Sequence, residues 1–248
     1  METYTPGHSE TATDFMSQRT WETHGGFFRD FLSPGMNVLD LACGPGTITL
    51  GIAAHVHPGQ VMGVDIGEAE ISRAQENATD AGVENVSFLT GSAYSLPLED
   101  HSVNAVFCHG LFEHLQFPDS VMEEIHRVLK PGGLVGLCSP DWGGFVLSPA
   151  SPEIDAAIET YMRLQSANGG DVKAGRKLGA FLDQAGFEDV QMNARYECYA
   201  SLPRIALFLA ERLESVGEKP HAEALKTWSV SRGGMFAQAW ISAVGRKA

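Results

Sequence analysis

The chain has few basic residues and no long apolar run. Lysine and arginine together number 17, against 31 aspartates and glutamates, so the formal net charge is -14. This excess of acid argues against a protein that follows nucleic-acid phosphates or lies on an anionic membrane surface. No stretch approaches the ~18 apolar residues of a membrane span, and the first residues lack the pattern of a secretory signal. Small molecules and proteins remain as partners.

Cysteines are also few, and none forms a C-x-x-C pair. Separated cysteines in apolar segments favour buried free thiols over a disulfide framework, and we expect a cytoplasmic protein because free thiols are typical of a reducing compartment. No H-x-x-x-H pair or carboxylate cluster has the spacing of metal ligands, so we expect no metal requirement. The four cysteines are Cys43, Cys108, Cys138 and Cys198.

What the chain does have is enough apolar material for a large core, with 44% hydrophobic residues among 248. Strand-like and helix-like segments alternate along its first half, which predicts an α/β fold with a parallel sheet covered on both faces. The expected strands are 37–42, 60–65, 86–90, 103–108 and 133–139, and the expected helices are 46–55, 68–81 and 119–129. Further on, amphipathic segments near 152–167 and 172–185 predict two more helices.

The most informative segment is the one in which an apolar strand from Val38 runs into a turn of small residues. Gly44 and Gly46 carry no Cβ, so a ligand can approach the main chain there. A second strand ends at Asp65, about 20 residues downstream, the spacing at which a carboxylate meets the hydroxyls of a ribose. Two strand ends are therefore expected to face one nucleoside-like ligand.

The chemistry of this turn favours a cationic ligand over a dinucleotide. A dinucleotide site prefers a third small residue where this chain has Thr49, and no P-loop lysine follows the glycines. Asp40 just before the turn would repel a pyrophosphate but suits a sulfonium group. A nicotinamide-dependent oxidoreductase stays open as an alternative, and so does a catalytically idle cofactor-binding module.

The segment from Asp40 to Gly46 resembles the first motif of the class I S-adenosylmethionine-dependent methyltransferases. The similarity is strong over residues 38–139, and the most similar branch resembles the ubiquinone and menaquinone C-methylating enzymes. Later motifs match in order and spacing: Gly91-Ser92-Ala93 with Leu96-Pro97-Leu98, then Ser102 to Phe107, Glu113-His114-Leu115, and Val128 to Gly133. The resemblance implies S-adenosyl-L-methionine as cofactor, S-adenosyl-L-homocysteine as product, and a small-molecule acceptor.

The resemblance also implies a Rossmann-like, mostly parallel seven-stranded sheet with an antiparallel C-terminal edge hairpin and helical lid elements. We expect one methyltransferase domain over 1–248, with the oligomeric state open between monomer and dimer. Its expected parts are a helical lid at 1–33, a cofactor-binding core at 34–139, acceptor-covering insertions at 140–185 and 201–233, and edge strands at 186–200 and 234–246.

These considerations predict a set of cofactor-binding residues. Asp65 is expected to hold the ribose, Ile66 to face the adenine unless it is a core residue, and Ser92 to bond the adenine where many relatives have an acid. Arg19 pairs with the cofactor's carboxylate and Trp21 shields the sulfonium, unless this segment is simply a helix packed on the core. The full set is Arg19, Asp40, Ala42, Cys43, Gly44, Gly46, Asp65, Ile66, Ser92, Ala93 and His109.

For catalysis, His109 and His114 are the candidate bases, because an imidazole titrates near neutral pH and both follow the fourth strand. The alternative is that these histidines only cap or pack against the next helix. Aromatic residues expected around the acceptor suggest that it is a small hydrophobic or aromatic metabolite. They are Trp142, Phe145, Tyr161, Tyr196, Tyr199, Phe208 and Trp228.

Overall fold

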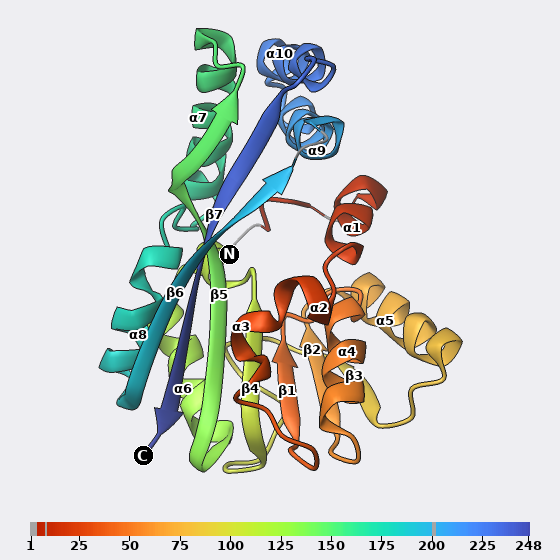
Figure 1. Ribbon diagram of the computed structural model, residues 1–248, viewed down its shortest axis with the longest axis vertical. Coiled ribbons are helices and arrows are strands. Elements are labelled where there is room, and N and C mark those ends of the chain that lie inside the picture. Colours follow the sequence, from red (N-terminus) through yellow and green to blue (C-terminus); the bar gives the residue numbers. More distant parts are fainter. Residues whose placement is uncertain (1–3, 8, 200–201) are drawn as a thin grey trace.

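Seven strands form one sheet in the order β3-β2-β1-β4-β5-β7-β6 in the computed structural model, which describes residues 4–7, 9–199 and 202–248 (Figure 1). Strands β1 to β5 are parallel, and β7 runs antiparallel to both β5 and β6. The strands are β1 (Val38–Leu41), β2 (Val61–Asp65), β3 (Val86–Thr90), β4 (Val103–His109), β5 (Leu129–Ser148), β6 (Phe187–Tyr199) and β7 (Met235–Lys247). The Rossmann-like sheet and its antiparallel edge hairpin are confirmed.

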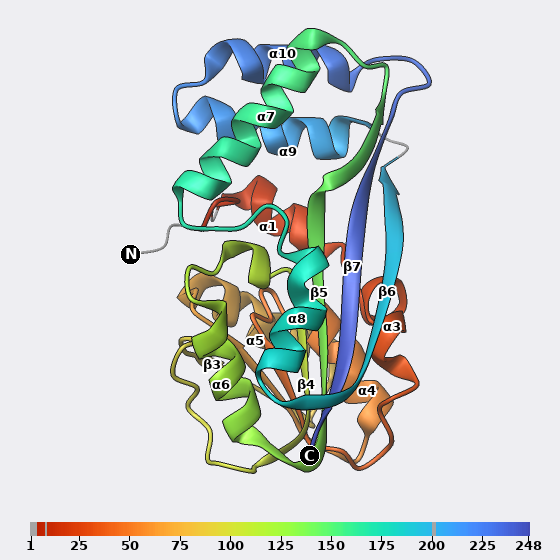
Figure 2. The ribbon, with the colours of Figure 1, turned by 90° about the vertical axis from the view of Figure 1, so that its left-hand side faces the viewer.

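Helices cover both faces of this sheet, as Figures 1 and 2 show for α4 and α8. On one face, Phe28 of α3 and Ile52 of α4 pack with Phe107 of β4; on the other, Ile125 of α6 and Leu182 of α8 pack with Val106. The helices are α2 (Trp21–His24), α3 (Gly26–Arg29), α4 (Thr47–Val56), α5 (Glu68–Ala81), α6 (Pro118–Val128) and α8 (Leu178–Gln184). The central strands β1 and β4 are therefore nearly fully buried.

Helix α5 shows how local signals set an element's ends. Acidic Glu68 and Glu70 lie in its first turn, where they complement the positive end of the helix dipole. Gly82 follows its last residue in the left-handed conformation, and its N–H bonds the carbonyls of Ala78 and Thr79. The observed bounds, Glu68–Ala81, are those expected from the sequence.

A second layer of helices stands beyond the carboxyl ends of the strands (Figure 2). It consists of α7 (Pro152–Ala167), α9 (Leu202–Ser215) and α10 (Lys219–Ser229), and α1 (Glu10–Ser17) lies between α9 and the sheet. Ile158, Leu209 and Leu225 of this layer share one apolar cluster with Phe15 of α1 and Phe236 of β7. This second layer of helices, which we call the roof, is therefore attached to the sheet through the long strand β7.

Strand β5 is longer than the sequence indicated. The expected strand ended at 139, but β5 extends to Ser148 and pairs with β7 on both sides of an irregularity between Asp141 and Val146. Two glycines in that irregularity let the strand bend without losing its partner. The local sequence did not indicate this extension, because the pairing partner, β7, lies almost 100 residues further along the chain.

The expected helix 172–185 is also shorter, because only α8 and a preceding 3-10 turn, η2 (Gly175–Lys177), are helical. Asp171 organises the first residues differently: its carboxylate accepts the N–H of Lys173 at 2.9 Å, and its carbonyl accepts that of Ala174 at 3.0 Å. Gly175 then packs on β5, where an added Cβ would lie 2.8 Å from the carbonyl oxygen of Ser139.

The cysteine prediction holds for three of the four residues. Cys43, Cys108 and Cys138 are buried free thiols, but Cys198 is exposed. It lies on the outermost strand, β6, where alternate side chains face solvent. The expectation that all four are buried was wrong for this one, because an edge strand has one uncovered face.

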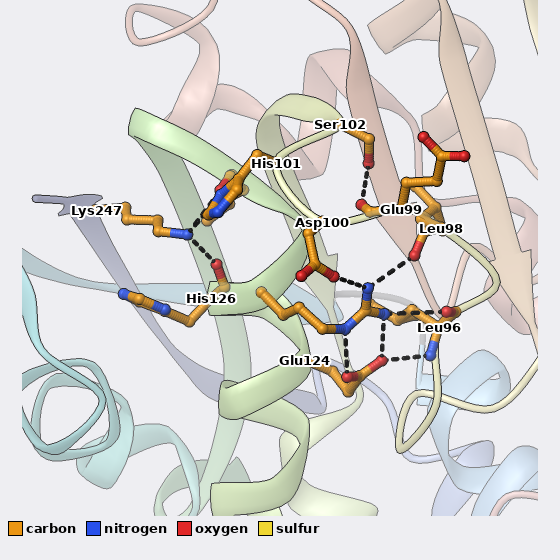
Figure 3. A network of polar contacts seen from close by, with 11 residues as sticks. Leu96, Leu98, Glu99, Asp100, His101, Ser102, Glu124, His126 and Lys247 are labelled. Atoms are coloured by element: carbon orange, nitrogen blue, oxygen red, sulfur yellow. Dashed lines mark hydrogen bonds and ion pairs between the residues drawn. The ribbon is translucent and has the colours of Figure 1, made fainter.

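A polar network fastens the connection between β3 and β4 to helix α6 (Figure 3). Arg127 donates to Glu124 at 2.7 Å, to Asp100 at 2.8 Å and to the carbonyl of Leu98 at 2.8 Å. Glu124 in turn accepts the N–H of Leu96 at 2.6 Å. The network holds the same connection that contains Ser92.

We expect Arg127→Ala to lower the free energy of unfolding by about 1–2 kcal/mol, since several hydrogen bonds to a partly exposed guanidinium are lost together. Urea unfolding measures the change. Arg73→Ala, at an exposed position of α5, is the matched control, and equal effects of the two substitutions would contradict a role for the network.

Candidate functional site

A cavity of about 200 Å³ opens at the carboxyl ends of β1, β2 and β4, where open α/β sheets bind their ligands. We call it the first cavity. It brings together most of the residues expected to bind the cofactor: Arg19, Ala42, Cys43, Gly44, Asp65, Ile66, Ser92, Ala93 and His109. Asp40 and Gly46 do not line it.

The two glycines of the turn have different surroundings. A Cβ built on Gly44 would meet no atom of the described chain within 4 Å, so this glycine faces open space. A Cβ on Gly46 would lie 2.9 Å from that of Ala74 and 3.0 Å from the ring of Phe88. Gly46 therefore lets helix α5 and strand β3 pack tightly against the turn, and its cofactor contact stays a prediction.

Asp65 joins the ends of two strands through its carboxylate. Oδ2 accepts the N–H of Gly44 at 2.9 Å, and Oδ1 accepts that of Gly67 at 2.9 Å. Each carboxylate oxygen has two lone pairs, so these bonds are compatible with a further hydroxyl donor. The apolar side chain of Ile66, which follows, is 72% exposed beside the cavity.

Asp40 lies behind the wall of the first cavity. Thr49 donates its hydroxyl to Oδ2 of Asp40 at 2.6 Å. Burial raises the pKa of the Asp40 carboxyl to about 7, against the lowering effect of the Thr49 hydrogen bond. Thr49, which departs from the dinucleotide pattern, is thus the partner of this buried acid.

The N-terminal segment contributes one of its two expected residues to the cavity. The guanidinium carbon of Arg19 lies 5.1 Å from the ring centroid of Trp240 and 5.8 Å from that of Phe15. Trp21 is instead a core residue, 5.8 Å between centroids from Phe107, and an added Cβ on Gly51 would collide with it. The expectation that Trp21 shields the sulfonium was wrong, because its ring fills the gap between α2 and α4.

A second cavity, of about 60 Å³, adjoins the first. Five residues line both: Tyr4, Met16, Arg19, Gly110 and His114. Four of the expected aromatic residues line the second cavity, namely Trp142, Tyr161, Tyr199 and Phe208, and Phe15 and Trp240 join them. Phe145 and Trp228 instead pack around Phe236, and Tyr196 is 58% exposed on β6.

Both candidate histidines lie in the walls. His109 lines the first cavity and stacks on Trp240 with 4.5 Å between centroids; burial, followed by the charge of Arg19, lowers its pKa well below the usual value. Burial lowers the pKa of His114 to about 3. Both imidazoles are therefore neutral and weakly basic at neutral pH.

Glu113 is the residue that the sequence reasoning missed. It is buried in the wall of the second cavity, where burial raises the pKa of its carboxyl to about 7. Ser139 donates its hydroxyl to Oε2 at 2.7 Å, and Nε2 of His114 lies 3.6 Å from Oε1. The sequence did contain a signal for it: an acid that follows the end of β4 by four residues and lies among the apolar residues Leu111, Phe112 and Leu115.

The residues that the structure describes were searched for a metal site and for a membrane-spanning helix. Among residues 4–7, 9–199 and 202–248, no group of three histidine, cysteine, aspartate or glutamate side chains is placed to hold a metal ion. Asp141 pairs with Arg176 at 2.7 Å. Over the same part of the chain, no helix is both long and apolar enough to cross a bilayer.

Comparison with known proteins decides the family. A family model described as "Methyltransferase domain" matches residues 32–186, more than half of the chain. An uncharacterized methyltransferase of Schizosaccharomyces pombe is 30% identical over 205 residues, which cover 79% of this chain and 73% of that protein. The chain belongs to the methyltransferase domain family. This membership confirms the expected class I S-adenosylmethionine-dependent methyltransferase.

Two further similarities complete the comparison. A demethylmenaquinone methyltransferase of Lactococcus lactis is 39% identical over 133 residues, 52% of this chain and 49% of that protein, so this methyltransferase spans about half the length of that relative. The crystal structure of the YcgJ protein from Bacillus subtilis has a TM-score of 0.65 at 21% identity, covering 90% of this chain and 97% of that one. The second similarity supports the fold alone.

The buried acid behind the first cavity predicts a pH effect on stability. Because the folded pKa of Asp40 is raised to about 7, the folded state holds this proton between about pH 4 and pH 7 while the unfolded state releases it. Asp40 therefore makes the free energy of unfolding decline as the pH rises through that window.

We expect Asp40→Asn to reduce this decline, because the substitution removes the buried ionisable group. Urea unfolding at a series of pH values measures the difference from the native protein. Asp80→Asn, at an exposed position of α5, is the matched control. A pH dependence in Asp40→Asn identical to that of the native protein would contradict the assignment.

Proposed function

We propose that this methyltransferase holds S-adenosylmethionine in the first cavity and methylates a small hydrophobic or aromatic acceptor in the second. The observation that carries the proposal is the shared wall between the cavities, because a methyl donor and its acceptor must meet without water between them. The bound cofactor supplies an electrophilic methyl group on a sulfonium. The two adjoining cavities do not favour either alternative function, a nicotinamide-dependent oxidoreductase or a catalytically idle cofactor-binding module.

Different residues of the first cavity suit the ribose and the adenine of this cofactor. We assign the ribose hydroxyls to Asp65, the adenine face to Ile66, and the adenine edge to Ser92 and Ala93. Ile66 supports this assignment, because a large exposed apolar side chain beside a cavity gains free energy when a ring covers it. Gly44 leaves open space against the main chain, as close approach of a ligand requires.

Arg19 is assigned to the carboxylate of the cofactor's methionine part. It lies on the shared wall, and its planar guanidinium fits a carboxylate through paired hydrogen bonds. Stacking between Phe15 and Trp240 holds the side chain in place before the ligand binds. His109 and Cys43 complete the walls of this cavity.

The chain's own contribution to catalysis is mainly alignment. Holding two reactants in reactive geometry can lower a barrier by ~7–11 kcal/mol without a specialised side chain. The aromatic walls of the second cavity favour an acceptor with a flat apolar body, since such rings bury large apolar areas with defined geometry. Phe15 of α1, with Ile205 and Phe208 of α9, adds further apolar wall to the second cavity.

We expect Asp65→Ala to weaken binding of S-adenosylhomocysteine by about 1.5–3 kcal/mol, because hydrogen bonds to a charged group are lost. Isothermal titration calorimetry measures the affinity, and thermal unfolding monitors the loss of the bonds to Gly44 and Gly67. Glu68→Ala, at an exposed position three residues later, is the control. Unchanged affinity in Asp65→Ala would contradict the ribose assignment.

A separate experiment tests Arg19. We expect Arg19→Ala to weaken binding of S-adenosylhomocysteine by about tenfold or more, since a charge-assisted pair with a carboxylate is removed. Binding of 5'-methylthioadenosine, which has no carboxylate, serves as the internal control and should change little. Equal losses for both ligands would place Arg19 elsewhere than at the carboxylate.

A further inference from the structure

We propose that the second cavity accepts a neutral aromatic molecule bearing a hydroxyl group, and that Glu113 takes the hydroxyl proton as the oxygen is methylated. The inference rests on the proposed function, because it needs a methyl donor in the first cavity. It adds to that function the chemical class of the acceptor and the identity of the base.

Glu113 is held through both its side chain and its main chain. The residue is 4% exposed and lies in the cavity wall, and Ser139 donates its hydroxyl to one carboxylate oxygen at 2.7 Å. Its main-chain carbonyl accepts the side-chain amide of Gln165 at 2.9 Å and the N–H of Asp171 at 3.0 Å. A residue whose main chain and carboxyl are both bonded keeps that carboxyl in a fixed place, preorganised to receive a proton from a bound molecule.

Glu113 is also the strongest proton acceptor of the three candidates at neutral pH. A base is most effective when its pKa lies close to the working pH. Burial raises the pKa of Glu113 to about 7, whereas it lowers that of His114 to about 3 and that of His109 well below its usual value. The histidines therefore shape the wall, and the carboxylate takes the proton.

Three buried polar atoms of residues that line the same cavity have no hydrogen-bond partner among the residues that the structure describes. They are Nδ1 of His114, Oε1 of Gln238 and Nε1 of Trp240. The Gln238 amide nitrogen already donates to the carbonyls of Asp141 at 3.0 Å and Ala239 at 3.2 Å, which orients the side chain. A bound molecule with polar substituents on an apolar ring would supply hydrogen-bond partners for such atoms.

The charges around the cavity favour a neutral acceptor over an ammonium ion. The second cavity adjoins the first, where the cofactor's sulfonium is positive, so a cationic acceptor would bring a second positive charge close to it. A neutral hydroxyl avoids this repulsion and donates a hydrogen bond to Glu113. The titratable and charged groups that act on Glu113 or respond to it are Arg19, His114, Tyr4, Tyr161, Cys108 and Cys138.

The proposed step balances in atoms and electrons. The hydroxyl oxygen forms a bond to the methyl carbon, and the bond from that carbon to sulfur breaks with its electron pair remaining on sulfur. The O–H pair stays on oxygen while the proton goes to the Glu113 carboxylate. The products are an aryl methyl ether, S-adenosylhomocysteine and protonated Glu113, which returns its proton to solvent.

The test uses 4-methylphenol as the probe and 4-methylanisole as its counterpart without a hydroxyl, both titrated by NMR into protein saturated with S-adenosylhomocysteine. We expect the affinity for 4-methylphenol to rise as the pH increases through about 7, because ionised Glu113 accepts the stronger hydrogen bond. The affinity for 4-methylanisole should not follow the pH. In Glu113→Gln, binding of 4-methylphenol should weaken about tenfold or more and lose its pH dependence.

Two further variants complete the design. Ser139→Ala keeps the carboxyl but removes a hydrogen bond that lowers its pKa, so the midpoint of the pH dependence should move upward. This shift tests the proposal even if Glu113→Gln folds poorly. Glu123→Gln, at an exposed position of α6, is the matched control and should behave like the native protein.

The outcomes separate this inference from the proposed function. Failure of the native protein to bind S-adenosylhomocysteine would overturn the proposed function itself. With that binding intact, the Glu113 assignment is overturned by absent 4-methylphenol binding, by equal affinity for the two probes, or by a pH dependence that persists in Glu113→Gln. Tighter binding of benzylammonium than of 4-methylphenol would overturn it in favour of an amine acceptor.

Discussion

The bridge made by the Asp65 carboxylate between the main chains of Gly44 and Gly67 is the contact on which the first cavity depends. It joins the turn after β1 to the turn after β2, so both strand ends present a fixed surface. Tight packing at Gly46 supports the same turn from behind. Parallel strands bring these ends to one edge of the sheet, and the carboxylate then fixes their relative position.

Burial acts on the acids and the histidines of this methyltransferase in opposite directions. Removal from water disfavours every charged form, so it raises the pKa of Asp40 and Glu113 to about 7 and lowers that of His114 to about 3. Near neutral pH, the imidazole of His114 is therefore neutral, and the two carboxyls are close to the midpoint of their ionisation. The same physical cause separates a residue suited to proton transfer from those that only shape the wall.

Prediction from sequence worked best where the signals are short in range. The bounds of α5, β3 and α7 match the expected segments, because caps, glycines and apolar periodicity lie within each segment. It failed for residues 140–148, which are strand only because β7 pairs with them. It also misplaced Trp21 and overlooked Glu113, since neither residue's neighbours in the chain reveal what packs against it in space.

The sequence by itself determined the order of strands and helices, the cofactor class and the residues at the two strand ends, because glycines, acids and apolar runs act through local backbone geometry. Only the tertiary structure decided which side chains meet across the two cavities. Four residues of the second cavity come from segments far apart in the chain, and they are brought together by the N-terminal segment and by the register between β5 and β7: Tyr4, Glu113, Gln238 and Trp240. Burial of a charge depends on those distant neighbours, so the pKa of Glu113 and its proposed role arise only in the folded chain.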